Sequence, residues 1–432
     1  MKKRFIFILC GLFLCAGTIA ATDYNALQQG AVGDGKTLNT QSLQSAIDAL
    51  HAKGGGQLYF PAGRYLTGSL QLKSNVTLYL EKEAMLLGST SPYDYPGFST
   101  EKELKVNNDH FDQALIYVEG AENIDITGEG CIDGQGRELA LTIDSLHHTG
   151  ELVDKHYNTY RKRPNTRPKL LFMRNCRKVE LRKTNFRSGA AWGLSFSLCA
   201  DLTIDSLHVE NRAYWNNDGI DISDCKEVRI SNCFINSADD GICLKSHNRG
   251  AWNDRVSISN CHIISSASAI KFGTESLGGF KNVTIDNIRI KDTFRSAIAI
   301  ESVDGAEIEN VKLENIEIVC PGRATRGMAY MSVSRLKDVP ENEKGYPEFT
   351  MFEELPSWGF YVRHVKGIQM HNVKLRLQED DFRPAFVFDR VSNVRLSGIS
   401  LPENKKAGQV VLRQTSLQSA DNAVKEYITE VE

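Results

Sequence analysis

Residues 216–246 read NNDGIDISDCKEVRISNCFINSADDGICLKS and contain one short phrase twice. DGIDIS begins at Asp218, and its counterpart DGICLK begins 22 residues later at Asp240. Related phrases without the acids, SAIKF from Ser268 and SAIAI from Ser296, follow at intervals of 28 residues. Apolar residues alternate with other residues in each phrase, which is the period of a β-strand. One short strand in each unit of this length predicts a solenoid of stacked coils, which we interpret as a parallel β-helix.

Stacking of the coils would bring acidic side chains together. Neighbouring coils lie one strand spacing apart, about 4.8 Å, so residues of equal phase form columns. Asp218 and Asp240 have equal phase, and Asp239 stands beside Asp240. We therefore expect three carboxylates in one small patch on the outer wall of the solenoid.

Size and charge limit the classes of protein. The chain has 432 residues, of which 41% are hydrophobic, and its formal net charge is −3. That length exceeds one ordinary globular domain, whereas a solenoid grows by adding coils. The charge gives no electrostatic reason to expect nucleic acid as a partner. We expect a single β-helix domain over residues 21–432 that acts as a monomer.

The N-terminus has the features of an export signal over residues 1–20. Lys2, Lys3 and Arg4 precede an apolar run over residues 5–16, and small residues lead to a cleavage site near Ala20. A buried first strand is the alternative. The signal predicts a periplasmic or extracellular protein, and no later run is long and apolar enough to span a bilayer.

Cysteine and asparagine recur in coil phase. Eight cysteines follow the signal segment, and we expect buried thiols stacked inside the coils, although export also permits disulfides. Four strand-like segments are each followed by an asparagine, at Asn232, Asn260, Asn287 and Asn315. We expect these side chains to bond the backbone of the coils above and below.

Several segments interrupt the repeat. Residues 40–50 have apolar side chains at the spacing of one helical face and predict a helix that caps the open end of the solenoid. Residues 89–112, 141–168 and 321–356 are polar, and we interpret them as loops that leave the coils. The second loop is rich in histidine, arginine and lysine, so it forms either a solvated surface or a contact for an anionic sugar.

Spacing alone leaves three interpretations of the acid patch. One protonated carboxyl could give its proton to a leaving oxygen while an ionised one activates water, which is the chemistry of glycoside hydrolysis. Crowding of like charges favours such a pair, because it raises the pKa of one member. The acids could instead bind a hard cation such as calcium. Asp-Gly is also a common turn pair with no chemical role.

A wider set of motifs carries a family resemblance. The set comprises NNDG at 216–219, Asp239-Asp240, Lys245-Ser246 and N-terminal phrases such as GDG at 33–35 and LKSN at 72–75. It resembles the polygalacturonase family, family 28 of the glycoside hydrolases. The resemblance implies a right-handed single-stranded parallel β-helix with an open groove, which hydrolyses α-linked galacturonate chains of pectin with inversion. It implies that Asp218 and Asp239 activate the water, that Asp240 is the general acid, and that no metal or organic cofactor takes part.

Two departures from the family pattern bear on the substrate. The family's Gly-His-Gly is replaced by ASA at residues 267–269, and its Arg-Ile-Lys by AIE at residues 299–301. The missing cations would hold a galacturonate carboxylate beside the cleaved bond, and Glu301 would repel it. The rhamnogalacturonan-cleaving branch is similar in lacking these groups, and rhamnose has no carboxylate. We therefore place rhamnogalacturonan slightly ahead of homogalacturonan as the substrate.

Six residues are candidate contacts for a pectic polysaccharide or oligosaccharide: Asn216, Lys245, His247, Lys271, Glu275 and Glu301. Lys271 has the outward parity of its strand, with a solvated lysine as the alternative. His247 could replace the missing histidine, with a loop histidine of no role as the alternative. Two other functions compete with hydrolysis. One is a polysaccharide lyase, which would need calcium and a basic arginine or lysine near the acids, and the other is a non-catalytic pectin-binding β-helix.

Overall fold

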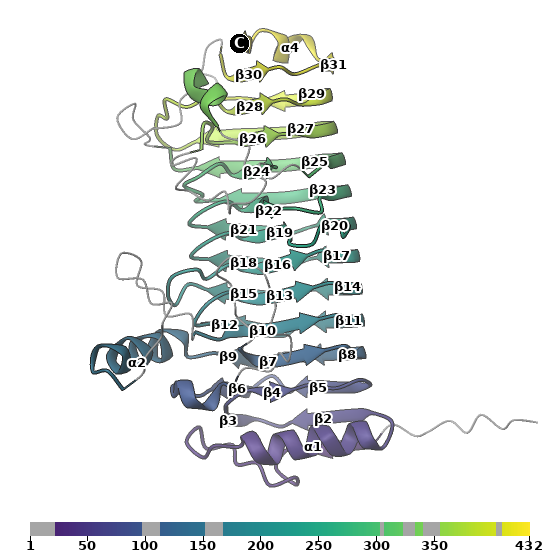
Figure 1. Ribbon diagram of the computed structural model, residues 1–432, viewed down its shortest axis with the longest axis vertical. Coiled ribbons are helices and arrows are strands. Elements are labelled where there is room, and N and C mark those ends of the chain that lie inside the picture. Colours follow the sequence, from purple (N-terminus) through teal and green to yellow (C-terminus); the bar gives the residue numbers. More distant parts are fainter. Residues whose placement is uncertain are drawn as a thin grey trace, which may run out of the picture.

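The computed structural model describes residues 22–96, 113–151, 167–302, 306–322, 333–339, 355–402 and 408–432. They form a tall stack of coils in which strands of successive coils lie side by side (Figure 1). The expected right-handed parallel β-helix is confirmed. The export signal predicted for residues 1–20 lies outside the described residues, as do large parts of the three expected loop segments.

The strands form two sheets with parallel pairing. The twelve-stranded sheet contains, in spatial order, β4 (Leu70–Gln71), β7 (Ala114–Glu119), β10 (Lys169–Arg174), β13 (Leu194–Ser197), β16 (Ile220–Ser223), β19 (Ile242–Ser246), β22 (Ile270–Ser276), β24 (Ile298–Glu301), β26 (Phe360–Arg363), β28 (Phe386–Asp389), β30 (Val410–Arg413) and β32 (Ile428–Val431). The twenty-stranded sheet contains β1 (Thr22–Asn25), β2 (Gly56–Phe60), β3 (Gly63–Thr67), β5 (Val76–Leu80), β6 (Ala84–Gly88), β8 (Glu122–Thr127), β9 (Cys131–Asp133), β11 (Arg177–Arg182), β12 (Asn185–Arg187), β14 (Ala200–Asp205), β15 (His208–Asn211), β17 (Lys226–Ser231), β18 (Phe234–Ser237), β20 (Asn253–Ser259), β21 (His262–Ser265), β23 (Phe280–Lys291), β25 (Ile308–Cys320), β27 (Val365–Leu377), β29 (Ser392–Ser400) and β31 (Leu417–Ala420).

The twelve-stranded sheet keeps one register through its central coils. Ile220 of β16 pairs with Ile242 of β19, and Ile242 in turn pairs with Ile270 of β22. The backbone N–H of Gly219 donates to the carbonyl oxygen of Asp240 at 2.9 Å, which fixes the phase just before these strands. The predicted column that contains Asp218 and Asp240 is therefore confirmed.

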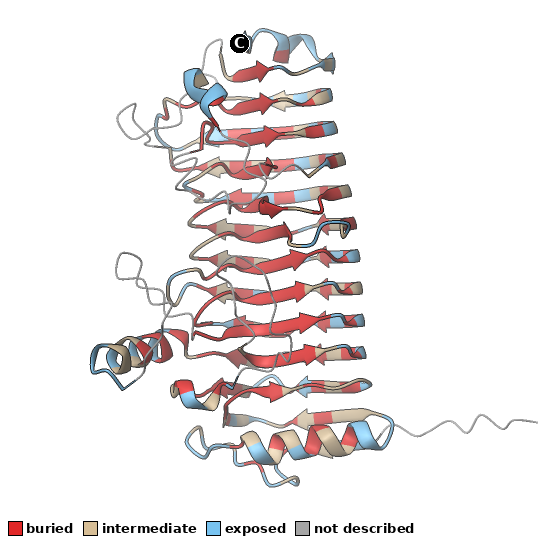
Figure 2. Cartoon of the chain, in the orientation of Figure 1, coloured by how far each residue is buried: buried red, intermediate tan, exposed pale blue. Residues whose placement is uncertain are grey.

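Aliphatic side chains fill the interior of the coils. Ile220 and Ile222 of one coil and Ile242 and Leu244 of the next are fully buried in one continuous apolar cluster. Figure 2 shows buried residues recurring along the strands of successive coils. Each buried methylene contributes about 0.8 kcal/mol of hydrophobic stabilisation, so columns of large aliphatic residues hold the coils in register.

The eight cysteines after the signal segment are all free thiols. Seven are buried and Cys131 is half-buried. The expectation of thiols stacked inside the coils is confirmed for six of them, which belong to the interior apolar cluster. It is wrong for Cys243, which is buried but pairs with Asp221 and Lys271 in the outward column of its strand.

The asparagine column differs from its prediction. Nδ2 of Asn260 donates to Oδ1 of Asn232 at 3.2 Å, and Nδ2 of Asn287 donates to Oδ1 of Asn260 at 2.8 Å. Asn315 donates to the carboxylate of Asp286 at 2.8 Å. The expected bonds to the backbone are therefore wrong, because these exposed side chains bond the side chains of the neighbouring coil. Their φ angles of 51–56° lie in the left-handed region, which asparagine tolerates better than most residues.

Helices cover the end and one side of the stack. Helix α1 (Thr40–Ala52) lies across the N-terminal coil with its apolar face buried, which confirms the predicted cap (Figure 1). Helix α2 (Gly136–His148) shows that the loop predicted from residue 141 is wrong over its first eight residues. Leu139, Ala140 and Ile143 are buried on one face of α2, so packing stabilises a helix in a polar segment. Shorter helices are η1 (Pro92–Asp94), η2 (Val333–Asp338) and α4 (Asn422–Lys425).

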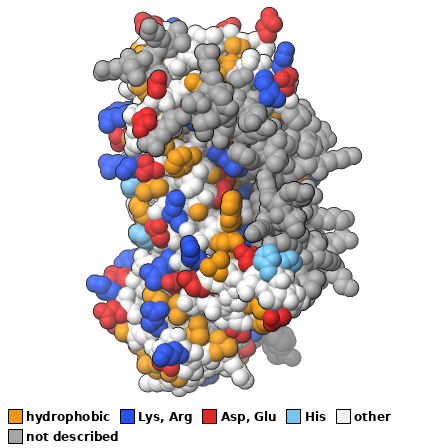
Figure 3. Space-filling view, turned by 90° about the vertical axis from the view of Figure 1, so that its left-hand side faces the viewer, with side chains coloured by type: hydrophobic (Ala, Val, Ile, Leu, Met, Phe, Trp, Pro, Cys, Tyr) orange, Lys and Arg blue, Asp and Glu red, His pale blue; other side chains and the backbone are white. Residues whose placement is uncertain are grey.

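The surface carries charges of both signs. On the described part of the face in Figure 3, lysine and arginine side chains are interspersed with aspartate and glutamate. This distribution agrees with the small net charge of −3. Among the helices that the structure describes, none has the length and apolar character needed to cross a membrane.

A pair of alanine variants tests the interior columns. Ile258→Ala on β20 should lower the free energy of unfolding by about 2–5 kcal/mol, because it leaves a cavity among fully buried residues. Ser257→Ala, at the neighbouring outward position, should have little effect. Urea unfolding of both variants followed by circular dichroism checks the difference, and equal losses would contradict the assigned parity of the strand.

Candidate active site

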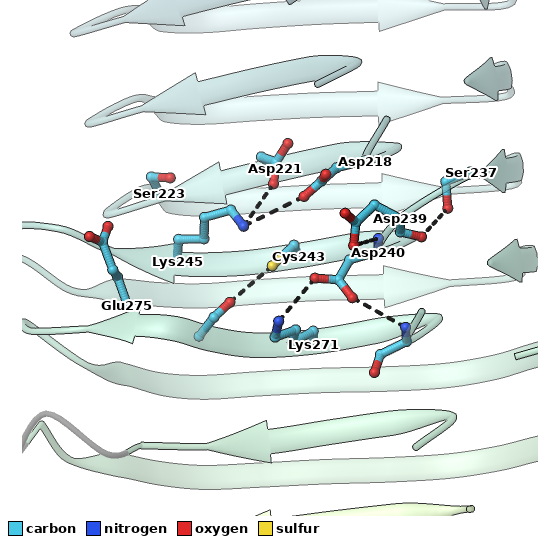
Figure 4. A network of polar contacts seen from close by, with 12 residues as sticks. Asp218, Asp221, Ser223, Ser237, Asp239, Asp240, Cys243, Lys245, Lys271 and Glu275 are labelled. Carbon is cyan, nitrogen blue, oxygen red and sulfur yellow. Dashed lines mark hydrogen bonds and ion pairs between the residues drawn. The ribbon is translucent and has the colours of Figure 1, made fainter. Parts of the chain in front are cut away.

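Two turns of adjacent coils carry the three acids. Asp218 stands between β15 and β16, and Asp239 and Asp240 stand between β18 and β19. The carbonyl oxygen of Asn217 accepts hydrogen bonds from the backbone N–H groups of Ala238 and Asp239 at 3.1 and 3.3 Å, which ties the two turns together. Figure 4 shows the three acidic side chains gathered on one patch.

The three acids differ in exposure. Asp218 and Asp240 are each only 3% exposed, whereas Asp239 is partly exposed. The backbone of Asp239 is nevertheless fixed, because its carbonyl oxygen accepts hydrogen bonds from the hydroxyls of Ser237 at 2.9 Å and Ser265 at 2.6 Å. Asp239 is therefore the member of the trio best placed to contact a substrate.

The glycine after each acid has a packing role. A Cβ on Gly219 would lie 2.4 Å from the carbonyl oxygen of Gly241, and a Cβ on Gly241 would lie 2.5 Å from that of Ala269. The coils approach too closely here for any side chain. The glycine of each Asp-Gly pair is therefore required by the close approach of the coils. A preference of Asp-Gly for turns does not by itself explain why glycine stands here.

Two buried lysines lie among the acids. Nζ of Lys245 lies 3.6 Å from Oδ2 of Asp218 and 3.4 Å from Oδ1 of Asp221. Nζ of Lys271 lies 3.2 Å from Oδ2 of Asp240. The side chains of Lys245 and Lys271 are only 2% and 10% exposed, so the alternative of a solvated Lys271 is wrong. Asp221 was not among the predicted site residues, although its outward parity in the strand was a usable signal.

Burial and like charge raise the pKa of two acids. Burial raises the pKa of Asp218 well above its usual range, and the charges of Asp221 and Asp239 add to the effect. Burial also raises the pKa of Asp239, and the charge of Asp240 raises it further. A carboxyl that holds its proton more tightly is suited to donate it to a leaving group near neutral pH.

The pKa of Asp240 shifts in the opposite direction. Burial alone would raise the pKa of Asp240, but the charges of Lys271, Lys245 and Arg295 outweigh burial and lower it. The backbone N–H of Ser268 also donates to its Oδ1 at 3.2 Å. Asp240 is therefore held as a carboxylate, which is the state of a base. These charges do not favour its expected role as general acid.

Lys271 supplies the cation next to Asp240. Ser268, at the position where the family resemblance leads us to expect histidine, donates its backbone N–H to Asp240, and its hydroxyl has no hydrogen-bond partner among the described residues. The pKa of Lys271 is raised by the charge of Asp240, against the lowering effect of burial. The two groups thus stabilise each other's charged forms.

His247 is fixed within a separate hydrogen-bonded group. Its Nδ1 contacts the carboxylate of Glu275, and its Nε2 lies 3.2 Å from the hydroxyl oxygen of Ser223. Its backbone N–H donates to Oδ2 of Asp224 at 3.0 Å. Ser223 pairs in register with Lys245, so this group adjoins the acid patch on the same sheet. The contacts of His247 go to these residues, and Lys271 instead occupies the position beside Asp240.

Glu301 lies on β24, the strand that pairs with the strand of Lys271 on the side away from Asp240. It is 2% exposed, and its Oε2 has no hydrogen-bond partner among the described residues. Burial raises the pKa of Glu301 to about 7, against the lowering effect of Lys271 and Arg363.

Asn216 and Arg167 shape the turn before Asp218. Asn216 adopts a left-handed φ of 56°, and its Oδ1 accepts a hydrogen bond from Nη2 of Arg167 at 3.3 Å. Nη1 of Arg167 donates to the carbonyl oxygens of Ala190 at 2.8 Å and Trp215 at 2.6 Å. Arg167 is fully buried, so the solvated-surface interpretation of its basic segment is wrong at this residue. Within the described residues the side chain of Asn216 bonds to Arg167 and supports the turn that carries Asp218.

A metal site was one interpretation of the acid patch. Across the described parts of the chain, no group of three or more histidine, cysteine, aspartate or glutamate residues is arranged to hold a metal ion.

The titration of Glu301 predicts a pH effect on stability. Its pKa is about 7 in the folded protein against an ordinary 4.5, so the folded state holds a proton that the unfolded chain releases between those pH values. Stability from this group therefore falls as pH rises through that window, by about 3 kcal/mol for a shift of this size. Glu301→Gln should remove this contribution to the fall, and the exposed control Glu180→Gln should keep it. Urea unfolding between pH 4.5 and 8 measures the difference, and parallel curves for Glu301→Gln and the wild type would contradict it.

Comparisons with known proteins agree with this fold. The family model described as "Glycosyl hydrolases family 28" matches residues 56–320, and one described as "Rhamnogalacturonase A/epimerase, pectate lyase-like" matches residues 24–85. A probable polygalacturonase of Vitis vinifera is 30% identical over 299 residues, which cover 65% of this chain and 55% of that protein. The exo-poly-alpha-D-galacturonosidase of Dickeya chrysanthemi is 28% identical over 248 residues, or 50% of this chain and 41% of the relative. The chain thus spans about half the length of the curated relatives it matches.

Solved structures show the same fold. The family 28 exopolygalacturonase of Yersinia enterocolitica superposes with a TM-score of 0.67 at 21% identity and covers 95% of this chain and 77% of that one. The polygalacturonase of Erwinia carotovora superposes with a TM-score of 0.59 at 18% identity and covers 90% of this chain and 96% of that one. Since the first family model matches more than half of the sequence, the chain belongs to glycoside hydrolase family 28.

Proposed function

We propose that the chain is an inverting glycoside hydrolase that cleaves α-glycosidic bonds in a pectic polysaccharide. The observation that carries the proposal is the division of charge within the acid trio. Cations hold Asp240 ionised, while burial and like charge raise the pKa of Asp239 and Asp218. Inversion needs one carboxyl that donates a proton and another that activates water, so acids of different pKa in one patch suit it.

We assign the proton donor to Asp239. It is the most exposed of the three acids, its pKa is raised, and its backbone is held by two serine hydroxyls. Asp240, kept ionised beside Lys271, takes the role of base toward the attacking water. Asp218 acts together with Asp240 on the attacking water, and its Oδ2 forms an ion pair with Lys245. This assignment exchanges the roles that family resemblance alone gave to Asp239 and Asp240.

The surroundings of Lys271 bear on the substrate. Glu301 adjoins Lys271 and becomes an anion as pH rises above about 7. A galacturonate carboxylate bound on this side of Lys271 would then meet a like charge, whereas a neutral sugar has no charge for Glu301 to repel. We therefore favour a neutral sugar at this position, as rhamnose would be in rhamnogalacturonan. Polygalacturonan remains the second substrate.

Replacement of each acid tests the roles. Asp239→Asn and Asp240→Asn should each lower turnover of the natural polymer by at least about a hundredfold. On an oligosaccharide with a nitrophenyl leaving group, Asp239→Asn should recover most of its activity, because that group leaves without a proton. Asp240→Asn should not recover, because water activation is still missing.

The control for these variants is Asp201→Asn, at an exposed position on β14, which should match the wild type on both substrates. Recovery of Asp240→Asn instead of Asp239→Asn would reverse the assignment. Formation of an unsaturated product, followed by ultraviolet absorbance and abolished by a chelator, would identify a lyase. Polymer binding without any product would identify a non-catalytic protein.

The preference for a neutral sugar is tested with Glu301→Gln. Repulsion between two carboxylates a few ångströms apart is on the order of 1–4 kcal/mol, so its removal should raise activity on homogalacturonan relative to rhamnogalacturonan by about tenfold or more. The change should be larger above pH 7 than at pH 5, because Glu301 is protonated at the lower pH. Initial rates on both polymers at the two pH values give the ratio. An unchanged ratio would remove Glu301 from the specificity of the site.

A further inference from the structure

The outer face of the twelve-stranded sheet changes from charged to apolar residues in the coils that follow the acids. The residues that follow Lys271 in its outward column, coil by coil, are Ala299, Tyr361, Val387 and Val411. All four are buried, and they form an apolar cluster separate from the interior of the coils. The sheet face on the C-terminal side of Lys271 is therefore a second dry core, in contrast to the charged patch beside it.

Two described parts of the chain, residues 333–339 and Leu355, cover this face. Leu336 of η2, Val339 just after it, and Leu355 complete the apolar cluster, and each is at most 5% exposed. Lys337 and Asp338 of the same segment are exposed, so η2 presents one apolar and one polar face. In Figure 1 this helix is the green coil beside β26 and β28. Burial of its apolar face against the sheet holds the cover in place.

Buried charges anchor the cover further. Arg363 of β26 is fully buried, and its Nη2 donates to the carbonyl oxygen of Val339 at 3.4 Å. The Nη1 atoms of Arg363 and Arg413 lie 3.0 and 2.8 Å from the two carboxylate oxygens of Asp389, which is also fully buried. Ion pairs in such a dry environment depend on exclusion of water, so the cover and the charges support each other.

The covered face begins close to the acids. Ala299 is the register partner of Lys271, whose Nζ lies 3.2 Å from Asp240. Successive strands are about 4.8 Å apart, and a pyranose unit of a polysaccharide spans about one such spacing. Room for a sugar chain on the C-terminal side of the acids therefore ends within one or two sugar units.

We propose that this protein attacks pectic polymers from a chain end and releases a product of one or two sugars, because η2 and Leu355 close the groove on the C-terminal side of the acid trio. The proposal rests on the proposed glycoside hydrolase function and adds its mode of attack. A polymer threaded through the site would have to displace Leu336, Val339 and Leu355 from the apolar cluster on this face of the sheet. A chain end needs no such displacement.

The products formed early in digestion by the wild-type chain test this directly. Rhamnogalacturonan and homogalacturonan are incubated with the protein, and viscosity, new reducing ends and product sizes are followed together. End attack predicts a single short product from the first time point, with viscosity nearly unchanged. A ladder of intermediate oligosaccharides with an early fall in viscosity would overturn the end-attack proposal and leave the hydrolase function standing. Absence of any new reducing end on either polymer would overturn both.

A matched pair of variants tests the role of the cover. Leu336→Ser removes an apolar contact under η2, whereas Lys337→Ser changes the exposed neighbouring residue. Leu336→Ser should produce longer oligosaccharides and a faster fall in viscosity than the wild type, and Lys337→Ser should give the wild-type pattern. A folded Leu336→Ser protein with wild-type products would show that Leu336 does not close the groove. If Leu336→Ser fails to fold, the wild-type product pattern still decides the proposal.

Discussion

Parallel pairing between coils, in constant register, is the constraint on which the rest of the structure depends. Hydrogen bonds such as that from Gly219 to Asp240 set the phase of two turns that are distant in sequence. The same pairing stacks Ile220 on Ile242, so burial of aliphatic side chains stabilises the register that brings the acids together. Fold and site therefore have one physical origin. A slip of one residue would turn Asp221 and Lys271 into the core and expose their apolar neighbours.

Buried charge gives the site its chemistry. Removal of charged groups from water is costly unless they are paired, and this structure pairs Lys245 with Asp218 and Asp221, and Lys271 with Asp240. The unequal distribution of the two lysines over the acids separates the pKa values of Asp239 and Asp240. The same column then changes from Lys271 to Ala299 and becomes apolar, which limits the space for a substrate. The charged residues of the site and the apolar residues under the cover therefore occupy the same outward column in successive coils.

Much of the fold could be predicted from the sequence, because the repeat phrases report coil length directly. Equal spacing was enough to put Asp218 and Asp240 in one column, and strand parity was enough to put Lys271 on the outer face. The helix over residues 40–50 followed from its apolar spacing. Helix α2 was missed because its buried face holds few residues within a polar segment, so its apolar spacing is a weak signal without knowledge of the packing partner.

Charge balance and covering segments could not be predicted in this way. The lowered pKa of Asp240 depends on the charges of Lys271 and Arg295, which lie 31 and 55 residues further along the chain, and on the burial of Asp240 itself. The burial of Arg167 depends on carbonyl groups of two other coils. The cover over Tyr361 comes from η2, a segment outside the repeat. Each of these features depends on contacts between residues distant in sequence, and such contacts produce no periodic pattern in the sequence.

The central claim, that the acids form one electrostatic unit with Asp240 as its ionised member, is tested most directly by carboxyl carbon NMR. The protein labelled with ¹³C at aspartate carboxyl carbons would be titrated, with assignments from single Asp→Asn variants. The account predicts that Asp240 titrates below the ordinary aspartate value of about 3.9 and Asp239 above it, and that Lys271→Met moves Asp240 upward. Independent titration of the three aspartates near the ordinary value, unaffected by Lys271→Met, would contradict it.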